Sequence, residues 1–93
     1  MKLPINYEEL DWAERKKVRE EYIKIQDGKC RQCGALLCEE ADESRPVQEL
    51  FSHLFPSGFF DHPIHLHHSH ETGMTIGAVH AVCNAALWVY EGE

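Results

Sequence analysis

Two pairs of metal-binding side chains, far apart in the sequence, constrain this chain most. Cys30 and Cys33 form a Cys-x-x-Cys pair, and His80 and Cys83 repeat its spacing with histidine in the first place. Three cysteines and one histidine are typical of a structural zinc site, which has four protein ligands and no open position. We therefore predict a zinc ion that ties the first knuckle to the start of the last helix. Taken alone, Cys30 and Cys33 also fit a redox pair or two plain cysteines, and Cys38 is a rival ligand.

The length of 93 residues predicts one small domain, residues 1–93, with a thin core. A bound metal commonly stabilises a domain of this size. No stretch approaches the roughly 20 apolar residues of a membrane span, and the N-terminal residues lack the apolar run of a signal peptide. We therefore expect a cytoplasmic protein with reduced thiols and no membrane partner.

The charge of the chain is unevenly distributed. Its formal net charge is −7, but seven of its nine Lys and Arg residues lie between Arg15 and Arg31. After Arg31 the chain has one basic residue, Arg45, and nine acids. The acidic total argues against a general nucleic-acid binder, whereas the basic segment could contact phosphates. The alternative is that this segment is only a solvated helix face.

The N-terminal region, residues 1–28, predicts one basic helix. Asn6 can cap its start, and Glu9 lies where it can reach back to the cap. The zinc knuckle follows at residues 29–38. The apolar positions of the helix are Leu10, Val18, Tyr22 and Ile25.

Further along the chain, the pattern predicts a short helix and then a strand–turn–strand–helix unit. Helical spacing of apolar residues marks the short helix at 47–55. Within 63–90, residues 64–67 and 74–79 favour two short strands, and residues 81–90 favour a helix. We therefore predict an α+β fold.

The same unit holds five of the seven histidines. His67, His68, His70 and Asn84 are not needed by the zinc site, yet they lie close together in sequence. Imidazole and amide groups can bind a divalent ion, and an imidazole can take a proton near neutral pH. We expect His65 to face solvent or the sheet surface. A purely structural alternative makes the paired histidines surface residues and Asn84 a cap of the last helix.

At these residues the chain resembles the HNH nucleases, and within them the phage recombination endonuclease VII type. That family has Cys-x-x-Cys, Asp-His-x-His, a Thr-Gly turn, a glycine in the second strand, and Cys-x-x-Cys-Asn opening a helix. The resemblance covers roughly residues 30–90. The matching residues here are Cys30, Cys33, His67, His68, Ser69, His70, Thr72, Gly73, Gly77, His80, Cys83 and Asn84.

The resemblance implies a ββα-metal (His-Me finger) fold and cleavage of DNA phosphodiesters with one divalent ion, in a bacterial or phage setting. His68 would be the general base that activates water, and His67 and Asn84 would hold Mg²⁺ or Mn²⁺. His70 would position the phosphate or protonate the leaving group. An anionic phosphodiester needs a Lewis acid and a base with a pKa near neutral. Contacts to DNA would be mainly to phosphates, so nicking would have weak sequence preference.

Departures from the family pattern bear on the metal and the substrate. His67 stands where the family has Asp, which shifts the preference toward Mn²⁺, Ni²⁺ or Zn²⁺ over Mg²⁺. His80 replaces a zinc cysteine. Ile76 stands where the endonuclease VII type often has Arg, so one phosphate contact would be missing. The middle Asn of the broader HNH signature is also absent.

Two other functions fit part of the sequence. A non-catalytic zinc module that binds nucleic acid or protein explains the knuckles and the basic helix, but not His67, His68 and Asn84. A thiol redox protein built on Cys30 and Cys33 leaves the histidines unexplained. The sequence leaves open whether the protein is a monomer or a homodimer, and whether its substrate is duplex, junction or single strand.

Overall fold

An antiparallel hairpin of two strands is the centre of the fold. The computed structural model describes residues 2–92, so the first and last residues of the expected domain lie outside it. The strands are β1 (Ile64–His68) and β2 (Thr75–His80). Strand β1 ends one residue later than the sequence predicts, and β2 begins and ends one residue later. Their register shifts between His67, which pairs with Gly77, and His68, which pairs with Thr75, so Ile76 is an extra, bulged residue of β2.

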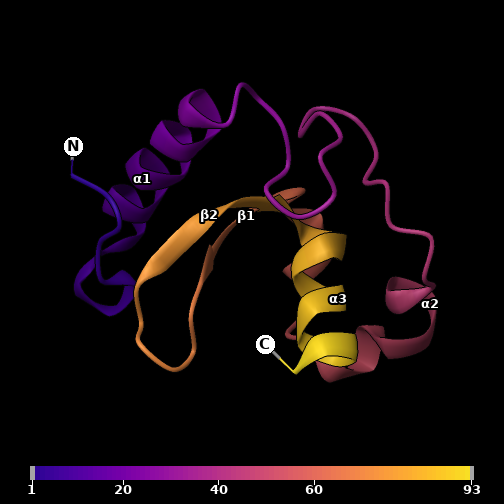
Figure 1. The fold of residues 1–93 in the computed structure, drawn as a ribbon. Helices are drawn as coiled ribbons and strands as arrows, with labels where there is room; N and C mark the ends of the chain where they lie inside the picture. Colours follow the sequence, from indigo (N-terminus) through magenta and orange to yellow (C-terminus); the bar gives the residue numbers. More distant parts are fainter. Residues whose placement is uncertain (1, 93) are drawn as a thin grey trace.

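Two helices pack against this hairpin, as Figure 1 shows. They are α1 (Trp12–Ile25), which follows the N-terminal segment, and α3 (Ala81–Glu91), which begins directly after β2. The smaller elements are η1 (Tyr7–Glu9), α2 (Val47–Phe51), η2 (Ser52–Leu54) and η3 (Phe59–Asp61). The predicted α+β class is therefore confirmed. Among the described residues, every helix is too short or too polar to cross a membrane.

The N-terminal helix starts later than its sequence predicts. The Asn6 side chain accepts a hydrogen bond from the backbone N–H of Glu8 and caps only the short turn η1. Helix α1 begins at a separate capping box, in which Asp11 and Glu14 each accept a hydrogen bond from the other's backbone N–H. Both caps fit the same rules, and the sequence prediction placed the start of the helix at the first, formed by Asn6 and Glu9.

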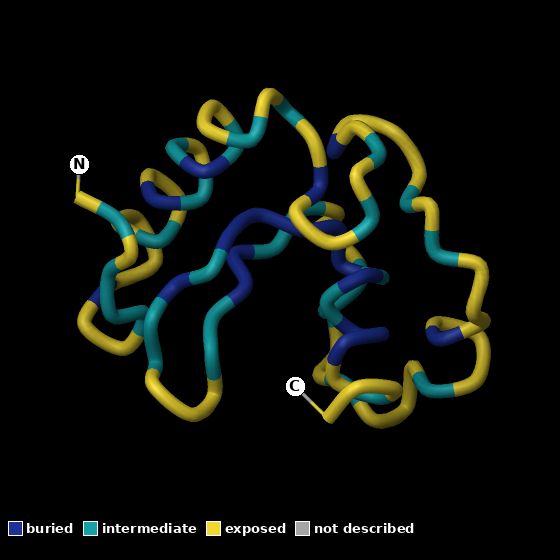
Figure 2. The backbone as a smooth tube through the Cα atoms, in the orientation of Figure 1, coloured by how far each residue is buried: buried dark blue, intermediate teal, exposed yellow. Residues whose placement is uncertain are grey.

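The core consists of two clusters, one on each side of the hairpin. The first joins α1, the knuckle and both strands through Val18, Tyr22, Leu66 and Val79, among others. The second packs α3 against α2, Phe55 and η3. Figure 2 shows the buried backbone concentrated where the strands and the first turn of α3 meet. Ile25, one of the apolar positions of the predicted helix, is 64% exposed, whereas the side chain of Gln26, directly after α1, bonds to β2.

The segment that precedes α1 runs beside the start of β2. Asn6 forms a bridge with Met74, and the Tyr7 backbone N–H donates to the Gly73 carbonyl at 2.8 Å. The Thr75 hydroxyl accepts a hydrogen bond from the Ile5 N–H and lies 2.8 Å from the Tyr22 hydroxyl. This short extension of the sheet brings Tyr7 to the end of β1.

Gln26 covers the free edge of β2. Its side-chain oxygen accepts from the Ala78 N–H and its nitrogen donates to the Ala78 carbonyl, both at 2.9 Å. The amide thus takes the place of a neighbouring strand. Gly77 is required beneath it, because a Cβ there would lie 2.7 Å from the Gln26 oxygen and 2.8 Å from the Arg31 Cδ.

We expect Gly77→Ala to destabilise the protein by about 1–3 kcal/mol, the usual cost of overpacking. The free energy of unfolding should be measured by urea denaturation. In a Gln26→Ala background the same change should cost clearly less, because one of the two clashes is gone. An equal cost in both backgrounds would contradict this account.

Candidate metal centre and histidine cluster

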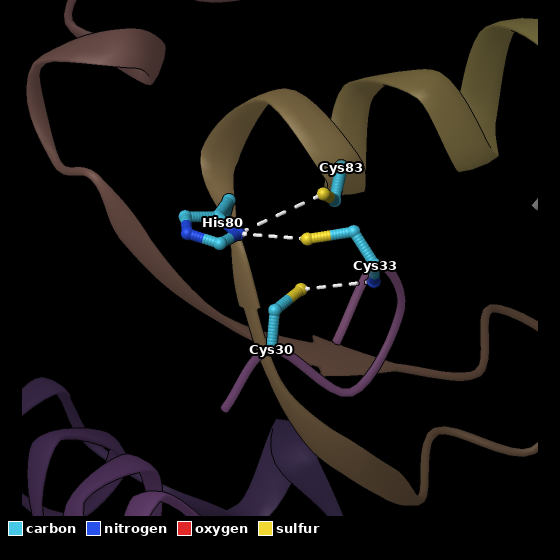
Figure 3. Close-up of side chains that lie close together, drawn as sticks. All are labelled: Cys30, Cys33, His80 and Cys83. Carbon is cyan, nitrogen blue, oxygen red and sulfur yellow. Dashed lines mark hydrogen bonds between the residues drawn. The ribbon is translucent and has the colours of Figure 1, made fainter. Parts of the chain in front are cut away.

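The four side chains predicted as zinc ligands converge at one point. Cys30 and Cys33 come from the knuckle loop, His80 from the end of β2, and Cys83 from the first turn of α3 (Figure 3). Their ligand atoms all lie within 4.8 Å of one another, and three of the four residues are buried. This Cys3His group could hold a metal ion such as zinc.

The knuckle loop is folded so that its backbone supports the sulfurs. The Cys30 N–H donates to the Ala35 carbonyl at 2.8 Å, and the Gly34 N–H donates back to the Cys30 carbonyl at 3.0 Å. Gly34 has a φ of 81°, a left-handed conformation that favours glycine. The N–H groups of Gln32 and Cys33 point at the Cys30 sulfur at 3.3 and 3.4 Å. Such donors stabilise a thiolate ligand.

The ring of His80 is oriented by its other nitrogen. Nε2 lies 3.0 Å from the Leu36 carbonyl oxygen and 2.9 Å from that of Glu39, and since carbonyls only accept, Nε2 carries the proton. Nδ1 then has the lone pair, and it lies 3.4 Å from the Cys33 sulfur and 3.8 Å from that of Cys83. In a tetrahedral zinc site these edges measure about 3.6 Å. The donor set therefore fits zinc, with a carbonyl shell that fixes the ligand tautomer.

The thiols of this group ionise unevenly. The pKa of Cys30 is lowered to about 4, because its sulfur accepts a hydrogen bond from the Cys83 thiol and from backbone N–H groups. The pKa of Cys83 is raised by the same contact and by burial. Ionising all three sulfurs would crowd negative charge in a buried space, so a bound cation would be strongly favoured.

Cys38 lies outside this group. It is exposed, and the cluster among the described residues consists of the four predicted ligands. A dithiol redox pair needs only Cys30 and Cys33. It gives no reason for His80 and Cys83 to converge on them.

The candidate catalytic histidines lie at the end of β1 and in the turn after it. His67 is only 7% exposed and pairs with Gly77 across the hairpin. Neighbours in a strand point to opposite faces, but His68 is the last residue of β1 and lies where the pairing shifts past Ile76, the extra residue of β2. At this irregular end of the hairpin, His67, His68 and His70 line one cavity of about 310 Å³, together with Ile76 and others.

The ring of His68 is stacked on Tyr7. Their centroids are 3.9 Å apart and the planes differ by 6°, and the Arg15 guanidinium carbon lies 3.9 Å from the Tyr7 centroid. The pKa of His68 is lowered, first by partial burial and then by the charges of His70 and His67. A lowered pKa favours the neutral imidazole, which can accept a proton. Sequence analysis missed Tyr7, because only the sheet extension brings it here.

Asn84 does not cap α3, because the cap position is His80. Its side-chain nitrogen lies 3.1 Å from His65 Nδ1, and His65 Nε2 lies 2.9 Å from the Phe59 carbonyl oxygen. Nε2 therefore carries the proton, and Asn84 donates to Nδ1. His65 is thus half-buried with both nitrogens bonded, and the expected surface role is wrong. Residues two apart in a strand lie on the same face, so the spacing of His65 and His67 was a signal that the two side chains share one face of β1.

Asn84 and His67 open onto adjacent cavities. Asn84 lines a cavity of about 250 Å³ with His70, Trp88 and apolar residues of segment 54–59. His70 also lines the cavity that contains His67 and His68, so the two spaces adjoin at this residue. No family model, curated protein or solved structure matches the chain.

We expect the purified protein to contain one zinc ion per chain by elemental analysis, and removal of the zinc to unfold it. Structural zinc contributes roughly 10–16 kcal/mol of apparent binding free energy, as much as or more than the whole stability of a small domain. Cys83→Ser should lose zinc and its cooperative thermal transition. Cys38→Ser is the matched control and should keep both. Clearly less than one zinc per chain, or an unchanged fold after chelation, would disprove the assignment.

Proposed function

We propose that this protein is a metal-dependent DNA endonuclease with a ββα-metal site built from β1, β2 and α3. The observation that carries the proposal is the shared cavity of His67, His68 and His70 at the end of a hairpin whose following helix carries Asn84 beside it. A structural cluster would explain the cysteines and His80. It gives no reason for three further histidines to face one space.

His68 is the general base in this proposal. Its lowered pKa favours the neutral ring that can take a proton from water. The parallel stack on Tyr7 holds the plane of the imidazole, so its nitrogens keep one direction. His70, 5.2 Å away from His68 between ring centroids, is exposed and can position the phosphate or give a proton to the leaving oxygen.

His67 and Asn84 would hold a divalent ion such as Mn²⁺ or Mg²⁺. When bound, that ion would neutralise charge on the scissile phosphate and the leaving oxygen. Because the Asn84 nitrogen donates to His65, the amide oxygen points away from this contact and is the atom suited to a metal. An imidazole ligand in place of a carboxylate favours Mn²⁺ over Mg²⁺.

Helix α1 supplies the positive charge that a DNA backbone needs. Lys16, Lys17 and Lys24 are exposed on it, and Arg15 is linked to the candidate site through the Tyr7 ring. Contacts of this kind bind phosphates without specifying bases, and they weaken steeply with salt. We therefore propose nicking with low sequence specificity.

The alternative is a zinc module that binds nucleic acid or protein without cutting it. The hydrogen bond between Asn84 and His65 favours this function, because it engages the amide with a protein group rather than with an ion. The two functions differ in one measurable respect, which is cleavage.

Supercoiled plasmid should be converted to open circle by the zinc-loaded protein with added Mn²⁺, and more slowly with Mg²⁺. His68→Ala should lower the rate at least tenfold, within the usual contribution of a general base. His53→Ala, at an exposed histidine of η2, is the matched control and should nick like the parent. All three proteins should be shown to hold zinc.

Equal nicking by the parent and His68→Ala would mean a contaminant or a misassigned base. Failure of the parent to cut with any ion, while zinc stays bound, would favour the binding module.

Tyr7→Leu should lower kcat about three- to tenfold with little change in KM, because it removes one aromatic pair that orients His68. Tyr7→Phe keeps the ring and should retain the parental rate. Tyr90→Leu, on the far end of α3, serves as the control for loss of a tyrosine. An equal loss in Tyr7→Phe and Tyr7→Leu would exclude stacking as the cause.

A further inference from the structure

We infer that the cavity between η2 and α3 binds one unpaired nucleobase of the DNA strand; this inference rests on the proposed function. The cavity has a volume of about 250 Å³. Its apolar wall includes Leu54, Phe55, Phe59 and Trp88, and its polar side includes His70 and Asn84. A flat, mostly apolar group with polar edges matches both sides of this lining.

The aromatic wall is held in place by its own contacts. The Phe55 ring stacks on Phe59 with 4.6 Å between centroids, and meets Trp88 edge-on at 5.6 Å. Trp88 is nevertheless 47% exposed, so part of the indole remains open to a ligand. Aromatic rings ordered in advance lose little entropy on binding and provide stacking surfaces for nucleobases.

The polar side connects this cavity to the candidate reaction site. His70 belongs to both cavities, and the Asn84 amide is oriented by His65. A base seated against Trp88 would therefore belong to a nucleotide close to the phosphate at His67 and His68. Imidazole and amide groups can also bond to the polar edge of a base.

The size of the cavity favours a single base. Pockets for drug-sized molecules are typically about 300–1,000 Å³, and this space is smaller. A base pair cannot enter it, and a paired base could enter only after leaving the stack, which costs a few kcal/mol. Single-stranded or locally unpaired DNA is therefore the favoured substrate, and stacking implies little preference among bases.

The two tryptophans allow a direct test. In a His68→Ala background, Trp12→Phe leaves Trp88 as the only indole, and Trp88→Phe leaves Trp12, which is 80% exposed on α1. A short oligothymidylate should quench the emission of Trp88 much more than that of Trp12, and a blunt duplex of the same length should quench Trp88 little. Quenching of Trp88 by the duplex as strongly as by the single strand, or no quenching of Trp88, would overturn the inference.

Affinity provides the second measurement. Trp88→Leu, which keeps an apolar side chain beside Phe55, should weaken oligothymidylate binding about five- to 150-fold, the range for one base–aromatic stack. Tyr90→Leu, at an aromatic residue of α3 that does not line this cavity, should bind like the parent, and both should keep zinc and their melting temperature. An unchanged affinity in Trp88→Leu would disprove the base site even if plasmid is nicked. Quenching and weakened binding without cleavage would keep the base site and disprove the nuclease.

Discussion

The convergence of four ligand side chains on one point is the constraint on which the rest of the structure depends. It joins the knuckle loop to the junction of β2 and α3, the two regions that would otherwise be held only by a thin core. Many of the buried residues around that junction are small, including Ala78, Ala81, Ala85 and Ala86. Small side chains remove little apolar surface from water, so packing alone contributes little there. A metal at this point would supply the missing stability and fix the direction in which α3 leaves the hairpin.

That direction matters because Asn84 follows Cys83 immediately. A residue next to a ligand is placed by the same contacts as the ligand, so the group that holds the fold also places a candidate ion ligand against His65. The opposite face of the hairpin is completed by the N-terminal segment. A two-stranded sheet is marginally stable alone in water. The edge contacts of Gln26 and the Thr75 hydroxyl network therefore support the strand that carries His80.

Spacing in the sequence predicted the local elements, namely the hairpin, α3 and the short helix after Pro46. It also predicted one long-range contact, the four-ligand group, because the chemistry of a metal site requires two matched half-sites to meet. Other contacts between distant segments carry no such chemical signal. Tyr7 meets His68 because residues 5–7 pair with the start of β2, and nothing near Tyr7 in the sequence indicates that pairing. The predicted start of α1 was wrong because two competing caps, Asn6 and Asp11, obey the same rule. Ile25, which belongs to the apolar pattern of α1, is exposed, and a polar residue just after the helix, Gln26, makes the contact with β2 instead.

The net charge of −7 is unevenly distributed: residues 15–31 carry seven basic residues against three acids, whereas the chain after Arg31 carries nine acids against one basic residue. The basic residues of segment 15–31 lie on α1 and the knuckle. Four acidic residues line a cavity beside α2: Glu39, Glu40, Glu43 and Glu49. Helix α2 lies on the side of α3 that faces away from α1 (Figure 1). Phosphates approaching from the acidic side would be repelled, and those approaching α1 would be attracted. The charge pattern would thus orient the protein on a strand before any base is contacted, with the end of β1 and its histidines between the basic helix and the aromatic cavity. At high salt this orientation would be lost first, because it depends on charges that solvent ions screen.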